Sequence, residues 1–452
     1  MKAIGIDIGT TTVCGIVIDA ENGKVLNVET LANDSLIEGE TYEWIQNPER
    51  IWELVQKLYQ EFAGTYQDIC SVGLTGQMHG IVYTDEDGQS VSPLYTWQDQ
   101  SGNELSEDGK TFVAHFIEET GYFIASGYGM ATYYYHMKKG LIPEKASCIC
   151  TIYDYIGMKL TGRNVPLLTP SSAASLGCFN LKEMVFEKRA LLEAGIRADI
   201  LPDIENGYVV LGKTKEGIPV GAGIGDNQAS VLGSVKNAGS SVLINVGTGS
   251  QVSVGVDHYV KAEHVELRPL INGDYILVGS GLCGGRAYAA LENFFRRTVT
   301  ELTGIDPGAM YGKMAEMLEK GNAPKYDLQI NTRFCGTREN PNLTGGISNL
   351  RLDNFTPEAL IEGVQRGIAE ELVTFYRSMR QQGARKPLCL VGSGNGIRKN
   401  PHLRKTFESI FEMKMQIPVH KEEAAYGAAL YAMAAAGIYE NIEDAQQLIC
   451  YL

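Results

Sequence analysis

The sequence predicts an α/β protein of two similar lobes with a ligand cleft between them. Its 452 residues exceed what one hydrophobic core usually supports, so two domains of comparable size are expected. Strand and helix patterns alternate along the chain, as they do in α/β proteins. A strand that runs into a Gly-Thr turn and then a second strand occurs twice, far apart, which suggests an internal duplication.

The first copy of this pattern lies at the N-terminus. Isoleucines alternate with Gly5 and Asp7 over residues 4–8, which is the period of a strand with one buried face. Asp7 is therefore held rigidly beside the turn Gly9-Thr10-Thr11-Thr12. The elements expected next are a strand over 13–18, a tight hairpin at Asn22-Gly23 and a strand over 24–29.

The second copy is a strand over 241–246, the turn Gly247-Thr248-Gly249-Ser250 and a strand over 251–256. We place the boundary at Val235–Ser240, which gives lobes of residues 1–235 and 236–452. Chance recurrence of Gly-Thr turns is the alternative, because the chain has 51 glycines. Other expected elements are a helix from Asn47-Pro48 to Ala63, a strand over 69–74, a helix over 356–382, a strand over 387–391 and a packed helix within 424–439.

The amino-acid composition limits the classes of partner that the protein is expected to bind. A net charge of −15 disfavours nucleic acid and anionic membranes, which need clustered Lys and Arg. A nucleotide stays compatible, since backbone amides and a bound cation hold polyphosphates locally. The sequence shows neither a signal peptide nor a membrane-spanning stretch, and its nine scattered cysteines favour free thiols, so we expect a cytoplasmic protein. Cys148 and Cys150 are close in sequence, but no second pair of cysteines follows at the spacing of a zinc site, so metal binding there is disfavoured.

The segment from Asp7 to Thr11 is the first candidate for chemistry. Gly9 permits close backbone approach to a phosphate, and Thr10 and Thr11 supply hydroxyl donors. Asp7 has the hard carboxylate oxygens that Mg²⁺ prefers. A simple capped turn would have the same pattern.

The segment Gly221 to Gln228 is the second candidate. Its three alternating glycines deliver Asp226 at the start of a predicted helix, where a carboxylate can take the proton of a substrate hydroxyl during phosphoryl transfer. The alternative role for Asp226 is a helix N-cap.

Two further segments have side chains typical of sugar sites. Gly76-Gln77-Met78-His79-Gly80 is a short loop with amide and imidazole groups, and Thr96-Trp97-Gln98-Asp99 offers an aromatic face and polar groups. A loop histidine is more often merely solvated. The glycine-rich turn that follows the strand at Leu390-Val391, Gly392-Ser393-Gly394-Asn395-Gly396, could pass under an adenine or ribose.

A dinucleotide-binding site is the rival hypothesis, since Gly279 to Gly284 has the glycine spacing of such a fingerprint between a strand and a helix. It lies in the middle of the chain, and no strand ending in an acidic residue follows at the required distance. The sequence contains no Walker A pattern, which disfavours a P-loop kinase.

Taken together, these motifs resemble the FGGY carbohydrate kinases of the actin and ribonuclease H-like superfamily. The resemblance covers nearly the whole chain in the family's order: 7–11, 76–80, the Asp226 loop, 247–250, 392–400 and 422–429. It implies two actin-like lobes with a cleft between them. It also implies transfer of the γ-phosphate of ATP, with Mg²⁺, to a primary hydroxyl of a ketose.

The resemblance also implies residue roles. Asp226 would be the catalytic base and Asp7 would bind the metal. The residues near the sugar would be Gln77, Met78, His79, Trp97, Asp99 and Asn227. The residues facing ATP would be Thr10, Thr11, Gly247, Thr248, Gly392, Ser393, Gly394 and Asn395.

Several alternatives stay open at the level of the sequence. Ser101 stands where many relatives have an arginine, and ketoses of five to seven carbons, pentuloses among them, are all candidate substrates. An actin-like ATPase that does not phosphorylate sugars is the alternative from another class, and a catalytically silent sugar sensor is a third. The partners expected are a ketose and ATP, without nucleic acid or membrane, and the chain could form a homodimer.

Overall fold

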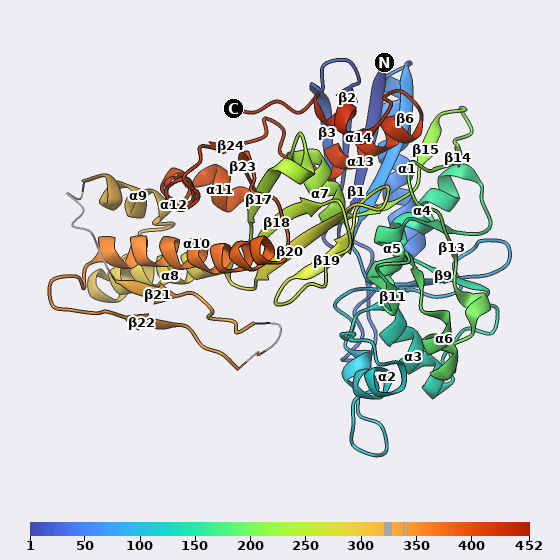
Figure 1. Cartoon of the computed structure of the whole chain (residues 1–452), viewed down its shortest axis with the longest axis horizontal. Helices are drawn as coiled ribbons and strands as arrows, with labels where there is room; N and C mark the ends of the chain where they lie inside the picture. The colour runs from blue at the N-terminus through green and yellow to red at the C-terminus, as the bar shows by residue number, and fades with distance from the viewer. Residues whose placement is uncertain (321–327, 338–339, 341) are drawn as a thin grey trace.

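The computed structural model describes residues 1–320, 328–337, 340 and 342–452. Figure 1 shows two bodies, one running from blue to green and the other from yellow to orange, each with a sheet at its centre. The red C-terminal segment returns to lie beside the blue N-terminal strands, so the two ends of the sequence meet in the first body.

The first sheet has the strand order β14-β15-β6-β1-β2-β3, with β16 also paired to β6. At its centre β1 pairs antiparallel with β2 and parallel with β6. The strands are β1 (Lys2–Ile8), β2 (Thr12–Asp19), β3 (Val25–Ala32), β6 (Ile69–Gly76), β14 (Val210–Lys213), β15 (Pro219–Gly221) and β16 (Ile224–Gly225).

The second sheet repeats this arrangement in the order β19-β20-β18-β17-β23-β24. Here β17 pairs antiparallel with β18 and parallel with β23. The strands are β17 (Ser241–Val246), β18 (Ser250–Val256), β19 (Glu266–Pro269), β20 (Tyr275–Gly281), β23 (Cys389–Ser393) and β24 (Met415–Gln416). The expected hairpins are both present at the centre of equivalent sheets, which agrees with an internal duplication.

Helices lie around the two sheets (Figure 1). In the first lobe they are α1 (Pro48–Thr65), α2 (Phe112–Thr120), α3 (Gly129–Lys139), α4 (Ile152–Thr161), α5 (Pro170–Leu176), α6 (Lys188–Glu193) and α7 (Asp226–Ser234). In the rest of the chain they are α8 (Gly284–Thr303), α9 (Tyr311–Lys320), α10 (Pro357–Gln381), α11 (Asn395–Lys399), α12 (Pro401–Phe411), α13 (Glu423–Ala435) and α14 (Ile442–Gln446).

The remaining strands form small sheets outside the two central ones. They are β4 (Leu36–Ile37), β5 (Ile45–Gln46) and β8 (Leu94–Tyr95) in one sheet, β7 (Val82–Thr84) with β9 (Cys148–Cys150), β10 (Leu167–Leu168) with β13 (Asp203–Ile204), β11 (Phe179–Asn180) with β12 (Val185–Phe186), and β21 (Gln329–Asn331) with β22 (Gly346–Ser348).

Capping residues in the sequence predicted the starts of two helices correctly. The Asn47 side chain caps α1 by accepting the backbone N–H groups of Glu49 and Arg50, and Thr356 caps α10. The strand expected over 387–391 instead spans 389–393, because its pairing with β17 begins at Cys389 opposite Ser241. The pairing partner, which the local sequence does not reveal, decides that boundary.

Helices α7 and α13 cross closely at the junction of the two lobes, and glycines make the crossing possible. A Cβ atom on Gly427 would lie 1.8 Å from the Ala229 carbonyl oxygen, and one on Gly233 would lie 1.9 Å from that of Glu423. Gly73 of β6 faces α13 just as closely. The C-terminal helix α13 therefore packs on the sheet of the first lobe, where it shares a core with β1, β2 and α7.

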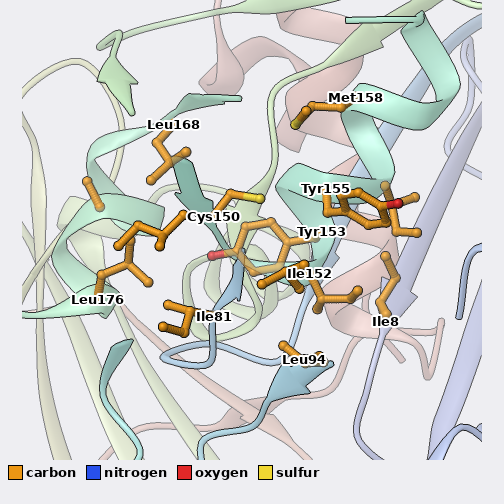
Figure 2. Packing of buried hydrophobic residues seen from close by; sticks show 14 of the residues in the cluster. Ile8, Ile81, Leu94, Cys150, Ile152, Tyr153, Tyr155, Met158, Leu168 and Leu176 are labelled. Atoms are coloured by element: carbon orange, nitrogen blue, oxygen red, sulfur yellow. The ribbon is translucent and has the colours of Figure 1, made fainter. Parts of the chain in front are cut away.

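The first lobe has its own large apolar core, part of which Figure 2 shows. Cys150 and Tyr153 lie there among aliphatic side chains such as Ile81 and Leu168 (Figure 2). Cys150 is fully buried, so the short cysteine pair in the sequence belongs to core packing. In the described parts of the chain, every helix is too short or too polar to cross a bilayer.

Candidate functional site

Three strands of the first sheet end side by side at one edge. Ile8 at the end of β1 pairs with Gly76 at the end of β6, and Gly76 pairs with Gly225 at the end of β16. The segments that follow these strands are the Gly-Thr turn, the loop from Gln77 to Gly80 and the first turn of α7. The fold therefore gathers three of the candidate segments at a single edge.

Asp7 and Asp226 are electrostatic neighbours at this edge. Burial first, and then the negative charges of Asp226 and Glu422, raise the pKa of Asp7 from 3.8 to about 7. Glu422 lies just before α13, so it reaches this edge because that helix packs on the first sheet. The site thus concentrates carboxylate charge, which favours a cation as a further component.

Asp226 is the first residue of α7, and Gly225 occupies the N-cap position. Burial raises the pKa of Asp226 to about 6, although the charge of Arg268 and the backbone N–H of Asn227 both lower it. A carboxylate with this pKa is largely ionised at neutral pH and can accept a proton. A side chain at 225 would meet Met78 Sδ, since a Cβ atom there would lie 2.7 Å away.

The Thr10 hydroxyl connects the Gly-Thr turn to the expected sugar residues. Trp97 Nε1 donates to Thr10 Oγ1 at 3.0 Å, and Thr10 Oγ1 donates to Gln77 Oε1 at 3.2 Å. Gln46 completes the network, because it accepts from Gln77 Nε2 at 2.8 Å and donates to the Thr10 carbonyl at 2.8 Å. Thr10 therefore orients Gln77 and the half-exposed Trp97 in this structure, while Thr11 is exposed at the turn.

His79 adopts a backbone conformation that is uncommon for a residue with a side chain. Its φ is 75°, in the left-handed region, and such strained residues cluster at functional sites. Nδ1 of His79 lies 2.8 Å from the Ser175 carbonyl, which can only accept, so Nδ1 carries the proton. The ring packs on Tyr128 with a centroid distance of 4.2 Å. These contacts hold the imidazole in one orientation.

Asp99, two residues after Trp97 in the sequence, is fully buried. Its Oδ1 accepts hydrogen bonds from the backbone N–H of Ser101 at 3.0 Å and from the Ser101 hydroxyl. Burial raises the pKa of Asp99 to about 6, while the Ser101 bonds oppose the rise. The visible role of this carboxylate is to stabilise the turn that carries Trp97.

Asn227 has a polar atom suited to a ligand. Its Oδ1 is buried and accepts no hydrogen bond from any residue that the structure describes. An orphaned buried acceptor costs free energy unless a donor such as a substrate hydroxyl reaches it. Asn227 directly follows Asp226 in the first turn of α7.

The second lobe gathers the remaining candidates in the same way. Asn245 near the end of β17 donates from Nδ2 to Ser393 Oγ at the end of β23, at 2.9 Å. Gly394 has a φ of 79° and lies against the backbone of Val246. Apart from Thr10 and Thr11 of the first lobe, the residues expected to face ATP therefore lie at the adjacent ends of two strands: Gly247, Thr248, Gly392, Ser393, Gly394 and Asn395.

The glycines from Gly279 to Gly284 do not form a dinucleotide site. The strand before them, β20, is antiparallel to β18, whereas the dinucleotide fingerprint needs a parallel βαβ unit. The first amides of α8 are already used, since Gly285 N donates to the Gly247 carbonyl at 2.9 Å and Arg286 N to that of Thr248 at 3.1 Å. This helix supports the second Gly-Thr turn.

The residues of the first lobe fit a magnesium ion. Asp7 has the hard carboxylate oxygens that Mg²⁺ prefers, and it lies within range of the charges of Asp226 and Glu422. Mg²⁺ usually takes one or two carboxylates together with waters and substrate phosphates. Among the described residues no three His, Cys, Asp or Glu side chains form a ready-made metal cluster, which is compatible with such an open site.

Sequence reasoning missed three residues of this site. Gln46 closes the network around Thr10, Arg268 lies near Asp226, and Glu422 lies near Asp7. Gln46 and Arg268 have no local motif, and the residues that each of them meets at this site are distant in sequence. Glu422 does belong to a recognised motif at 422–429, but only the packing of α13 on the first sheet places it here.

Two family models match consecutive parts of the chain. Residues 2–233 match the N-terminal domain of the FGGY family of carbohydrate kinases, and residues 242–436 match its C-terminal domain. The two matches end and begin on either side of the loop between α7 and β17.

Individual relatives agree with the family models. The chain is 24% identical to human sedoheptulokinase over 472 residues, covering 94% of this chain and 96% of the relative. It is 25% identical to the xylulose kinase of Staphylococcus xylosus over 470 residues, covering 95% and 90%. The crystal structure of xylulose kinase from Rhodospirillum rubrum has the same fold, with a TM-score of 0.85, 20% identity and coverage of 100% and 93%. With both domain models matched in order, the chain belongs to the FGGY family of carbohydrate kinases.

Proposed function

We propose that this ATP-dependent sugar kinase transfers the γ-phosphate to a primary hydroxyl of a ketose, with sedoheptulose as the preferred substrate and sedoheptulose 7-phosphate as the product. The observation that carries the proposal is the placement of Asp7 and Asp226 at neighbouring strand ends of one sheet edge. The similarity to human sedoheptulokinase, which spans nearly both chains, supports the choice of sugar.

In this proposal Asp226 acts as the base. Its carboxylate accepts the proton of the attacking hydroxyl as the oxygen bonds to the γ-phosphorus and the β–γ bridging bond of ATP breaks. Arg268 and the N–H of Asn227 favour the ionised form of Asp226 against the effect of burial. Asn227 Oδ1 accepts a hydrogen bond from a second hydroxyl and so orients the sugar.

The other side chains bind and orient the two substrates. Gln77, His79 and Trp97 surround the sugar with amide, imidazole and aromatic groups, held by Thr10, Gln46 and Ser175. The glycine turns at 247–249 and 392–394 allow the backbone to approach the phosphates of ATP. Asp7 would hold the magnesium ion, which supplies charge neutralisation at the phosphoryl oxygens.

The proposal is tested by ADP release in the presence of sedoheptulose, xylulose, ribulose, fructose and glycerol. We expect the largest kcat/KM with sedoheptulose and a sugar-free rate that is far lower. A preference for xylulose or ribulose would replace the present substrate with a pentulose, and the similarity to a xylulose kinase makes that the second candidate. If no sugar raises the rate, the kinase proposal fails and an actin-like ATPase becomes the better description.

The role of Asp226 has its own test. Asp226→Asn keeps the size of the side chain and removes the proton acceptor, so turnover with the best sugar should fall by about 10² to 10⁴. Sugar affinity, measured by calorimetry, should change far less. A variant that retains most of its turnover would show that another group takes the proton.

A further inference from the structure

The guanidinium group of Arg268, a residue of the C-terminal lobe, lies near the strand ends of the N-terminal lobe that lead to Asp226. Arg268 is on β19, the edge strand of the second sheet, and β19 packs against α5 of the first lobe. The neighbouring Pro269 carbonyl accepts a hydrogen bond from Gln228 Nε2 at 3.0 Å. Gln228 and Asp226 both lie in the first turn of α7, so this hydrogen bond holds β19 close to Asp226.

The Arg268 side chain is held in one orientation by an acid on its own strand. Only 14% of it is exposed, and its Nε donates to Glu266 Oε2 at 3.0 Å while Nη2 donates to the same oxygen. A guanidinium has five N–H donors in a planar fork. The two bonds to Glu266 use Nε and one donor of Nη2, and the part of the chain that the structure describes shows no hydrogen bond from Nη1, so Nη1 can reach a third partner.

Two groups of the first lobe are within electrostatic range of this guanidinium. The negative charge of Asp226 and the Tyr128 hydroxyl both interact with Arg268 electrostatically. Tyr128 is also the ring that packs on His79. Arg268 therefore interacts with the expected base and with the ring that supports His79, and the docking of β19 on the first lobe brings it there from the lobe that carries the second Gly-Thr turn.

Building on the proposed function, we propose that Arg268 is a substrate-positioning residue that donates hydrogen bonds from the ATP lobe to a hydroxyl or carbonyl oxygen of the bound ketose. Glu266 compensates the charge of Arg268, so the pair is suited to a neutral sugar rather than to a sugar acid. Because the contact joins a sugar held by one lobe to a strand of the other, it also favours the closed arrangement of the lobes.

The inference is tested by steady-state kinetics of Arg268→Met, Arg268→Lys and the control Arg366→Met. Arg366 is a half-exposed arginine of α10 in the same lobe, and among the residues that the structure describes its ion pair is with Glu362, one helical turn away. Loss of a charged hydrogen bond predicts a rise of about 10- to 100-fold in the KM for the ketose with Arg268→Met. The KM for ATP should stay within about twofold of wild type, and the control should match wild type in both.

Arg268→Lys keeps the positive charge and is the conservative variant, to be used in case Arg268→Met fails to fold. It should give an intermediate KM for the ketose, since lysine retains a donor and loses the planar fork. An unchanged ketose KM in Arg268→Met, or equal rises in the KM values for ketose and ATP, would overturn the inference. These outcomes are distinct from failure of the proposed function, in which wild type itself would show no response to sugar.

The compensation of the Arg268 charge by Glu266 is tested by a separate experiment. Glu266→Gln leaves the guanidinium uncompensated, so the ratio of kcat/KM for gluconate to that for the ketose should rise by about tenfold. An unchanged ratio would contradict the part of the inference that concerns neutral substrates.

Discussion

The two Gly-Thr hairpins occupy equivalent places in equivalent sheets, yet their last polar strand residues differ. In the first hairpin this residue is Asp7, and in the second it is Asn245. Each is the next-to-last residue of a central strand, and each strand is followed by a three-residue turn that begins with Gly-Thr. The backbone is therefore repeated while the charge is not.

The surroundings of the two residues explain the difference. Asp7 lies near the carboxylates of Asp226 and Glu422, which raise its pKa together with burial. Asn245 is neutral and donates to Ser393 at the base of the other glycine turn. A negative charge suits the lobe where a cation and an attacking hydroxyl are needed, whereas a neutral amide suits the lobe where phosphates rest on backbone groups. Under the proposed function, the two hairpins would therefore differ in role through the charge of this one side chain.

The largest expected effect comes from removing the charge of the first hairpin. Asp7→Asn makes the two hairpins alike, and kcat should fall by about 10² to 10³, as for the loss of one electrostatic group in an active site. The Mg²⁺ concentration for half-maximal activity should rise as well. Activity within tenfold of wild type at ordinary Mg²⁺ would show that the charge at position 7 is not what separates the two hairpins.

A smaller effect is expected from adding a charge to the second hairpin. Asn245→Asp replaces the donor to Ser393 by a carboxylate facing the expected phosphates, so the KM for ATP should rise by about 10- to 100-fold. The KM for the sugar should change little.

Asn245→Ala is the matched control for this variant, because it removes the hydrogen bond without adding charge. It should raise the KM for ATP by only about fivefold. Equal effects of the Asp and Ala variants would mean that the hydrogen bond, rather than the charge, matters at this position.

The smallest effect concerns stability and has a definite dependence on pH. The pKa of Asp7 is raised in the folded protein from 3.8 to about 7, so the ionised form destabilises the fold above pH 7. Asp7→Asn should raise the melting temperature at pH 8 by about 2 to 5 °C, and this gain should fade as pH falls from 7 towards 4. Melting temperatures of wild type and Asp7→Asn, measured from pH 4 to pH 8, would test this prediction. Asn245→Asp, which adds a carboxylate instead of removing one, serves as the opposite change. A gain independent of pH would point to packing instead of charge.

Local sequence patterns predicted much of the framework. The alternation in residues 4–8, the cap at Asn47 and the turn glycines at 247–249 each lie within a few residues of the element they define, so the corresponding strands and helices were placed well. The ordered motifs also predicted the family, which the matches of both domain models bear out. The individual roles of the site residues stay predictions.

Other features depended on partners far away in the chain. The Thr10 hydroxyl bonds to Gln77 and Trp97, contacts that the local sequence does not reveal, and its role toward ATP stays a prediction. The limits of β23 followed from its pairing with β17. Arg268 reached the sugar side because an edge strand of one lobe docks on a helix of the other.

The sequence by itself determined the strand-turn-strand units and the types of side chain they carry, because hydrophobic period and turn chemistry act over a few residues. Only the tertiary structure decided which carboxylates share an edge and how far their pKa values rise. Burial and charge interactions depend on distances between segments. Here the pairing of β1, β6 and β16 brings Asp7 and Asp226 together, and the glycine-mediated packing of α13 on the first lobe brings Glu422.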